Sequence, residues 1–108
     1  MIYLLNQRNP YSVRLRTVVK VDKSSVLGNK SWRGIESERE ASCLKYDIWL
    51  KEKIKVGDRT VCDELNRLYL IAKKGNLYLA CWCAPKQCHS ESIKRVLEAK
   101  LHESRKNS

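Results

Sequence analysis

The chain has 108 residues, 43% of them hydrophobic and 31% charged, which is enough for one folded core and too little for two domains. Lysine and arginine outnumber aspartate and glutamate by 22 to 12, and the resulting charge of +10 favours a partner that carries phosphate. No stretch reaches the roughly 20 apolar residues of a membrane span, and the first residues lack the features of a secretory signal. We therefore expect a cytoplasmic protein with no membrane partner.

The first third of the chain predicts two strands and a loop. Residues 2–5 form a short apolar run, and residues 11–21 alternate between apolar and other side chains, which indicates a half-buried strand with a basic outer face. Residues 22–37 then read as a loop, in which Gly28-Asn29 is a turn signal. The backbone amides of Gly28 and Asn29 are candidates for binding an anion, and Trp32 is a candidate lid over the same pocket.

The first helix is predicted to follow this loop. Ser37 and Glu40 fit a capping box, in which each side chain bonds the backbone amide of the other residue. The helix should end near Ile54. We assign its inward face to the apolar positions Ala41, Leu44 and Ile48, with Cys43, Tyr46, Trp49 and Leu50 widening the arc.

Two further helices flank one more strand. Thr60 and Asp63 are a second capping candidate, and Gly75 ends this second helix. Residues 76–82 form a nearly continuous apolar run, as in an interior strand, and the last helix runs from Ser90 to about Glu103. The expected core positions of the two helices are Val61, Leu65, Leu68 and Ala72 in one, and Ile93, Val96, Leu97 and Leu101 in the other.

This order of elements predicts a small α/β domain of Rossmann-like type. Its sheet should be short, with three to four strands, and about three helices should pack on it. The domain covers residues 1–101, and residues 102–108 form a polar tail that we expect to be frayed.

The chemistry is densest in the stretch LACWCAPKQCHSES, residues 79–92. Cys81 ends the predicted interior strand, and Cys83, Cys88 and His89 lie in the turn before a helix, which is where ligands bind in open α/β sheets. The cysteine count of five is odd, and nothing predicts export to an oxidising compartment. The cysteines are therefore read as thiols, core residues or metal ligands.

In one interpretation the motif is a ligand site with a reactive thiol. Cys88 or Cys83 is then the nucleophile or the anion-binding group, and His89 carries the proton. Pro85 would shape the loop, and the ligand would lie against Trp82, Pro85 and Ser90.

Two other interpretations stay open. Cys81, Cys83, Cys88 and His89 would supply soft ligands for zinc, or less readily for an iron–sulfur cluster, although their spacing is not a common finger spacing. Alternatively, the motif is structural, with buried cysteines, a packing tryptophan and a capping histidine. A redox pair of Cys81 and Cys83 is a weaker form of the reactive interpretation.

The run Cys81-Trp82-Cys83-x-Pro85-x-x-Cys88-His89 resembles the signature of domain of unknown function 4326, an uncharacterised family of phage and bacterial proteins. The stretches SVLGNKSW and SEREASCLKYDIWL are similar to its Leu-Gly-Asn-Pro loop and to its Ser-Arg-Glu helix start. Lys30 stands in place of the family's proline, and Ser90 stands where many members carry glycine. The resemblance implies a compact α/β domain, often phage-encoded, in which the glycine loop and the cysteine loop form one site. It implies no particular reaction.

These patterns together predict a phage-type protein in the host cytoplasm that binds a nucleotide, a nucleotide-derived signal or nucleic acid, with or without catalysis. The alternative is a zinc-stabilised module without catalysis that binds nucleic acid or a host protein. In that alternative the contacts come from Arg14, Arg16 and Lys20 on the strand and from Lys94 and Arg95 on the last helix.

Overall fold

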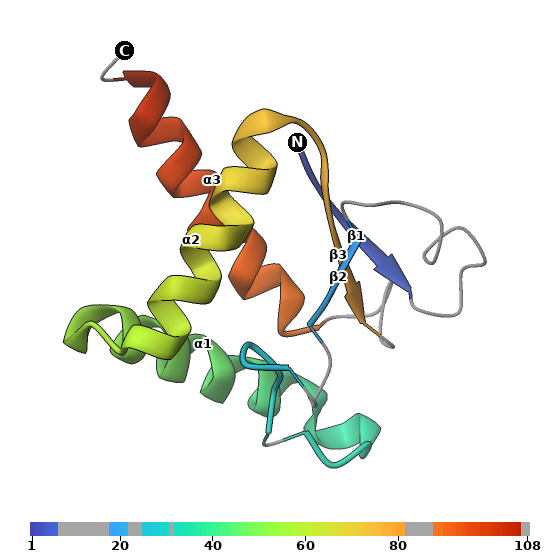
Figure 1. Cartoon of the computed structure of the whole chain (residues 1–108). Coiled ribbons are helices and arrows are strands. Elements are labelled where there is room, and N and C mark those ends of the chain that lie inside the picture. The colour runs from blue at the N-terminus through green and yellow to red at the C-terminus, as the bar shows by residue number, and fades with distance from the viewer. Residues whose placement is uncertain (7–17, 22–24, 31, 82–87, 107–108) are drawn as a thin grey trace.

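The computed structural model describes residues 1–6, 18–21, 25–30, 32–81 and 88–106. The strands β1 (Ile2–Asn6), β2 (Val18–Lys20) and β3 (Leu77–Cys81) form one parallel sheet in the order β1-β3-β2. The helices α1 (Arg39–Val56), α2 (Arg59–Lys74) and α3 (Ser90–Lys106) lie on one side of this sheet (Figure 1), and a short 3-10 helix, η2 (Glu36–Glu38), precedes α1. The predicted small α/β domain is therefore confirmed.

The central strand, β3, organises the sheet. Its residues Leu77 and Leu79 are buried, whereas Tyr78 on the opposite face stacks on Tyr3 of β1 with the ring centroids 5.2 Å apart. Because all three strands are parallel, their carboxyl ends lie at one edge, where ligands commonly bind in this fold class. At that edge the amide of Val21 donates to the carbonyl of Ala80, at 2.9 Å.

The strand predicted over residues 11–21 is observed in part. β2 begins at Val18, and residues 11–17 lie outside the described residues. Val19 is half-buried and Lys20 is exposed, in agreement with the predicted alternation.

The inward face of α1 matches the sequence prediction only in part: Tyr46 and Leu50 of the predicted arc are buried and Trp49 packs against the core, whereas the predicted central positions are exposed. Leu44 is 62% exposed and Ile48 is 58% exposed, while the buried residues are Ser42, Tyr46 and Leu50. Apolar side chains occur on more than one side of this helix, so their spacing alone did not identify the packed face. The buried face contains Ser42 and Tyr46, whose side chains form hydrogen bonds with the loop before the helix.

Both predicted helix caps were wrong, although the helices exist. Residues 36–38 form η2, and α1 starts at Arg39 with Glu38 as its N-cap and no side-chain cap hydrogen bond, so the Ser37–Glu40 capping box is absent from this described segment. In α2 the N-cap is Asp58, whose Oδ1 accepts from the amide of Val61 at 3.0 Å. Gly57, with φ of 71°, ends α1 in the left-handed conformation. Asp58 follows it directly as the N-cap of α2, so Thr60 lies inside the first turn of α2 and not at its cap.

The other two helices match their predicted core positions. All four predicted residues of α2 are buried, and in α3 Ile93 and Leu97 are buried while Val96 and Leu101 pack against the core. α3 contacts β1, β3 and α2, and it continues to Lys106, into the segment expected to be a frayed tail. None of the described helices combines the length and the apolar character that crossing a membrane requires.

The packed face of α1 can be tested with two leucines on the same helix. Leu50→Ala should lower the free energy of unfolding by about 2–5 kcal/mol because it leaves a cavity in the core. Leu44→Ala removes the same atoms from an exposed position and should change it by about 0.5 kcal/mol or less. Urea denaturation measures both, and equal losses would contradict the assignment.

The start of α2 can be tested in the same way. Asp58→Ala removes the side chain that accepts from Val61 and should cost about 1 kcal/mol. Thr60→Ala is the matched control, since Thr60 is exposed within the first turn, and it should leave the urea midpoint nearly unchanged. A larger loss for Thr60→Ala would restore the cap predicted from the sequence.

Candidate functional site

A buried histidine joins the carboxyl edge of the sheet to the start of α3. His89, at 7% exposure, contacts the carbonyl oxygen of Val21 through Nε2. A carbonyl oxygen can only accept, so Nε2 carries a hydrogen, and when the ring is neutral Nδ1 is the acceptor. The His89 ring also packs edge-on against the ring of Tyr46, with the centroids 5.0 Å apart.

Two cysteines lie beside this imidazole. Cys88 Sγ is 3.3 Å from His89 Nδ1 and 3.1 Å from Cys81 Sγ, while Cys81 Sγ is 3.7 Å from Ser90 Oγ. The two sulfur atoms are farther apart than the roughly 2.05 Å of a disulfide, so no covalent bond joins them. Glu91 Oε2 accepts from the amide of Cys88 at 3.2 Å, a contact that orders the start of α3.

The glycine loop is attached to the same region through α1. Tyr46 Oη donates to the carbonyl of Leu27 at 2.7 Å, and Asn29 Nδ2 donates to Ser42 Oγ at 2.9 Å. The amide of Gly28 donates to the carbonyl of Ser25 at 3.1 Å, which closes a turn. The amide of Gly28 is thus already hydrogen-bonded within the loop, and anion binding here would use other donors.

Tyr46 is the residue that links the loop to the histidine. Burial raises the pKa of its phenol, and the nearby Cys88 raises it further. The phenol therefore stays neutral and keeps donating to Leu27 at ordinary pH. Every described side-chain oxygen and nitrogen atom that is buried in this region has a hydrogen-bonding partner.

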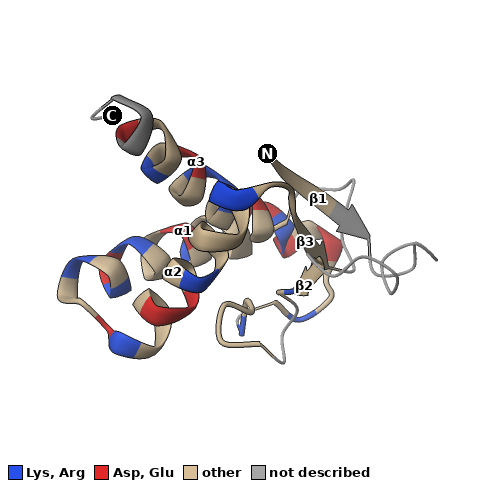
Figure 2. Ribbon diagram, turned by 45° about the horizontal axis from the view of Figure 1, so that its top comes forward, with Lys and Arg blue, Asp and Glu red and all other residues tan. Residues whose placement is uncertain are grey.

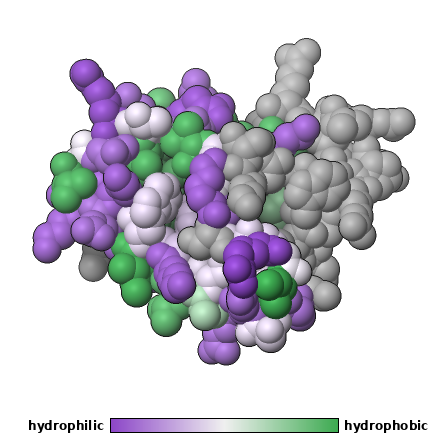
Figure 3. All heavy atoms as spheres, turned by 90° about the horizontal axis from the view of Figure 1, so that it is seen from below, coloured by the Kyte–Doolittle hydropathy of each residue, from purple (hydrophilic) through white to green (hydrophobic). Residues whose placement is uncertain are grey.

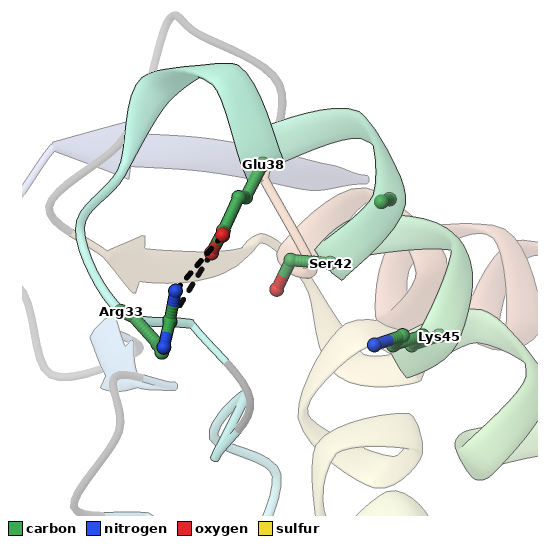
Figure 4. Close-up of a pocket in the computed structure, with 5 residues that line it drawn as sticks. Arg33, Glu38, Ser42 and Lys45 are labelled. Carbon is green, nitrogen blue, oxygen red and sulfur yellow. Dashed lines mark hydrogen bonds and ion pairs between the residues drawn. The ribbon is translucent and has the colours of Figure 1, made fainter.

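A hollow of about 460 Å³, named here the α1 pocket, lies next to the glycine loop. Figure 4 shows Arg33 turned toward Glu38, with Ser42 and Lys45 on the neighbouring turns of α1. Arg33 donates to both carboxylate oxygens of Glu38, at 2.9 and 3.2 Å, and this contact raises the pKa of the guanidinium. The lining residues are Arg33, Glu38, Ala41, Ser42 and Lys45.

A second hollow of about 210 Å³, the thiol pocket, opens over Cys88. The carboxylate of Asp47 is hydrogen-bonded by Lys51 and Ser92 and lies near Arg95, and these contacts hold its pKa below the usual value. The lining is mainly acidic, and it consists of Glu40, Cys43, Leu44, Asp47, Cys88, Glu91, Ser92 and Arg95.

The two pockets lie on opposite flanks of α1. Successive residues of a helix are turned by about 100° around its axis. The residue before Ser42 or Tyr46 therefore lies on one side of the buried face, and the residue after it lies on the other side. Ala41 and Lys45 line the α1 pocket, whereas Cys43 and Asp47 line the thiol pocket. The helix therefore separates a cationic hollow from an acidic one.

The structure brings together several of the residues singled out from the sequence. Cys81, Cys88, His89 and Ser90 meet at the start of α3, and Asn29 reaches them indirectly through α1. Trp32 is half-buried, with the Arg39 guanidinium 4.7 Å from the centroid of its ring. Trp82, Cys83 and Pro85 lie outside the described residues, so their assigned roles stay predictions.

Sequence reasoning missed the residues of α1 that organise this region. Ser42 and Tyr46 are four positions apart, so they lie on one face of the helix. Two hydroxyl-bearing side chains on one face, close after a turn, were the pattern that could have predicted hydrogen bonds from this helix to the loop. Lys45 and Arg33 carried no signal among the many basic residues of the chain.

The described residues contain no group of three or more His, Cys, Asp or Glu side chains arranged to hold a metal ion. Cys83, the fourth residue of the predicted zinc set, lies outside them.

The model of a family described as Domain of unknown function (DUF4326) matches residues 5–99 of the chain. No curated protein and no solved structure matches it significantly.

The role of Tyr46 predicts a pH dependence. Because the pKa of Tyr46 is raised on folding, the unfolded state loses its phenolic proton first, so stability is complete below pH ~10 and falls above it by up to about 1.4 kcal/mol per pH unit. Tyr46→Phe should remove that part of the slope and cost about 1–3 kcal/mol at neutral pH, since the Leu27 carbonyl loses its donor. Urea denaturation between pH 7 and 11 measures both effects, and parallel curves for the two proteins would contradict this assignment.

Proposed function

This chain belongs to the DUF4326 family, whose description names no activity, and we propose that it binds a small phosphate-bearing ligand of the nucleotide class. The binding position is the α1 pocket, next to the Leu27–Asn29 loop. The proposed setting is the cytoplasm, where nucleotides are abundant.

The observation that carries this proposal is the convergence of Arg33, Ser42 and Lys45 on one hollow (Figure 4). A guanidinium, an ammonium and a hydroxyl are the side-chain donors that proteins use to bind phosphate oxygens. The volume of about 460 Å³ is within the usual range for pockets that bind small molecules.

Lys45 is the strongest phosphate ligand of the three. Within the part of the chain that the structure describes, no carboxylate lies within ion-pairing distance of its ammonium group. Its charge is therefore not compensated locally, and a bound phosphate would supply the missing counter-charge.

Arg33 is held in place by Glu38 before any ligand arrives. The ion pair is exposed to solvent, with 66% of the Arg33 side chain accessible, so solvent screens it and a phosphate can compete for the guanidinium. Glu38 would then keep the guanidinium oriented through one nitrogen while a phosphate oxygen takes the other.

The loop beside the pocket is rigidly attached. Asn29 is buried and bonded to Ser42, and the carbonyl of Leu27 is bonded to Tyr46. The loop thus holds Ser42, which lines the pocket, and a lining residue that is already ordered loses little entropy when a ligand binds.

The charge distribution supports a small ligand over nucleic acid. Figure 2 shows lysine, arginine, aspartate and glutamate interspersed along the described helices. The face in Figure 3 likewise mixes hydrophilic and hydrophobic side chains. A nucleic-acid groove usually needs a surface of one sign, and Arg14 and Arg16, the residues predicted to contribute to it, lie outside the described residues.

The alternative of a zinc-stabilised module is favoured by one observation. Cys88 Sγ is 3.1 Å from Cys81 Sγ and 3.3 Å from His89 Nδ1, so soft donor atoms occur at the motif, although the described residues alone form no metal-binding group. A zinc site would need ligands from the part of the motif outside the described residues, with Cys83 as the predicted one. Catalysis by Cys88 and His89 also stays a prediction.

The proposal predicts that Lys45 controls nucleotide affinity. We expect one or more of the common ribonucleotides to raise the melting temperature of the protein, and the matching unphosphorylated nucleosides to have no effect. Lys45→Ala should weaken binding about tenfold or more, because a charged hydrogen bond to phosphate contributes about 1.5–3 kcal/mol.

Lys55→Ala is the matched control. Lys55 is an exposed lysine ten positions further along the same helix, so the variant makes the same change in net charge about 15 Å away. Titration by calorimetry should give the wild-type affinity for this control. If both variants bind alike, or if no ribonucleotide binds the wild-type chain, the α1 pocket is not a nucleotide site.

A further inference from the structure

Cys81 and Cys88 are placed for reaction with each other. Their sulfur atoms are 3.1 Å apart, so an approach of about 1 Å would bring them to the length of a disulfide bond. Cys81 ends β3 and Cys88 directly precedes α3, so such a bond would join the carboxyl edge of the sheet to the start of the helix.

The two thiols differ in access. Cys88, which is 3% exposed, lines the thiol pocket together with the half-buried Cys43, whereas Cys81, at 1%, does not contribute to the lining of that pocket. A reagent that enters the pocket therefore reaches the lining thiols Cys43 and Cys88, and Cys81 lies behind them.

Cys88 also has a base within reach. His89 Nδ1 is 3.3 Å from Cys88 Sγ, and it is the acceptor nitrogen because Nε2 is bonded to the carbonyl of Val21. A thiol beside an imidazole acceptor can give up its proton as it attacks an electrophile.

From this geometry we propose that Cys88 and Cys81 form a dithiol that exchanges with small disulfides. Cys88 Sγ attacks one sulfur of the disulfide and passes its proton to His89 Nδ1, and the other sulfur leaves as a thiolate that recovers this proton. Cys81 Sγ then attacks Cys88 Sγ in the mixed disulfide, and the second thiol leaves with the proton of Cys81. In total, two protein thiols and one small disulfide give one protein disulfide and two small thiols.

The pocket selects among disulfides by charge. Three carboxylates, those of Glu40, Asp47 and Glu91, line the pocket with the guanidinium of Arg95, and the ammonium of Lys51 pairs with Asp47 from outside the lining, which leaves the site with a net negative charge. A cationic disulfide such as cystamine is therefore attracted, and an anionic one such as oxidised glutathione is repelled. This reaction occurs on the opposite flank of α1 from the proposed nucleotide site and does not depend on it.

The experiment uses the full-length reduced chain, freed of metal by a chelator and then incubated with cystamine. Alkylation under denaturing conditions followed by peptide mass mapping should show the loss of two of the five alkylatable thiols, with Cys81 joined to Cys88. Cystamine should react faster than uncharged hydroxyethyl disulfide, and oxidised glutathione should be slowest.

Single substitutions separate the two steps. Cys81→Ser should stop the reaction at a mixed disulfide on Cys88, and Cys88→Ser should leave Cys81 unmodified. Cys43→Ser removes the other thiol that lines the pocket, so it is the matched control and should form the Cys81–Cys88 bond as the wild type does.

Several results would overturn the proposal. They are a bond from Cys83 to either partner, five thiols that remain alkylatable after incubation with cystamine, or a reversed order of the three reagents. Tightly held zinc in the protein purified without chelator, with Cys81 and Cys88 protected until its removal, would also overturn it. Peptide mass mapping of the wild-type protein tests the proposal by itself, so the test still holds if one of the variants fails to fold.

Discussion

The buried contact between His89 and the carbonyl of Val21 holds the described carboxyl edge of the sheet against the start of α3. It also fixes the tautomer of the imidazole, so that Nδ1 faces Cys88, and it sets the ring against Tyr46. Tyr46 in turn holds Leu27 through its hydroxyl. The His89 side chain thus connects the residue after β2, the middle of α1 and the start of α3, which are separated by up to 68 positions in the sequence. Cys88, Tyr46 and Leu27 are linked by this connection, and Asn29 is held separately by Ser42.

The same connection decides which side of α1 is buried. Ser42 and Tyr46 carry oxygen atoms that would be costly to bury without partners, and the Leu27–Asn29 loop supplies those partners. Leu44 and Ile48 remain in solvent even though their transfer to the core would by itself be favourable. Burying them would turn the two polar residues away from the loop. The hydrogen bonds of Ser42 and Tyr46 therefore determine the packed face of α1 as much as the burial of apolar surface does.

With that face fixed, the two flanks of α1 acquire different chemistry. One flank exposes the cations of Arg33 and Lys45 beside an ordered loop, and the other carries carboxylates around a buried thiol. A phosphate-bearing ligand is favoured in the first hollow and disfavoured in the second. A small disulfide of positive charge has the opposite preference. The proposed binding function and the proposed thiol reactivity can therefore coexist in one small domain without competing for the same residues.

The amino-acid sequence by itself determined the α/β class, the interior strand, the core stripes of α2 and α3, and the place of the cysteine motif between a strand and a helix. These features depend on local periodicity and on glycine signals, which neighbouring residues alone can set. The start of α2 is also a local feature, because Asp58 accepts from Val61 three positions further on, although the sequence pattern was first assigned to Thr60. Only the tertiary structure decided that Ser42 rather than Leu44 is buried on α1, and that Cys81 lies against Cys88. The physical reason is that each of these depends on a partner brought close by folding: the Leu27–Asn29 loop for α1, and the imidazole that Val21 holds in place for the thiols.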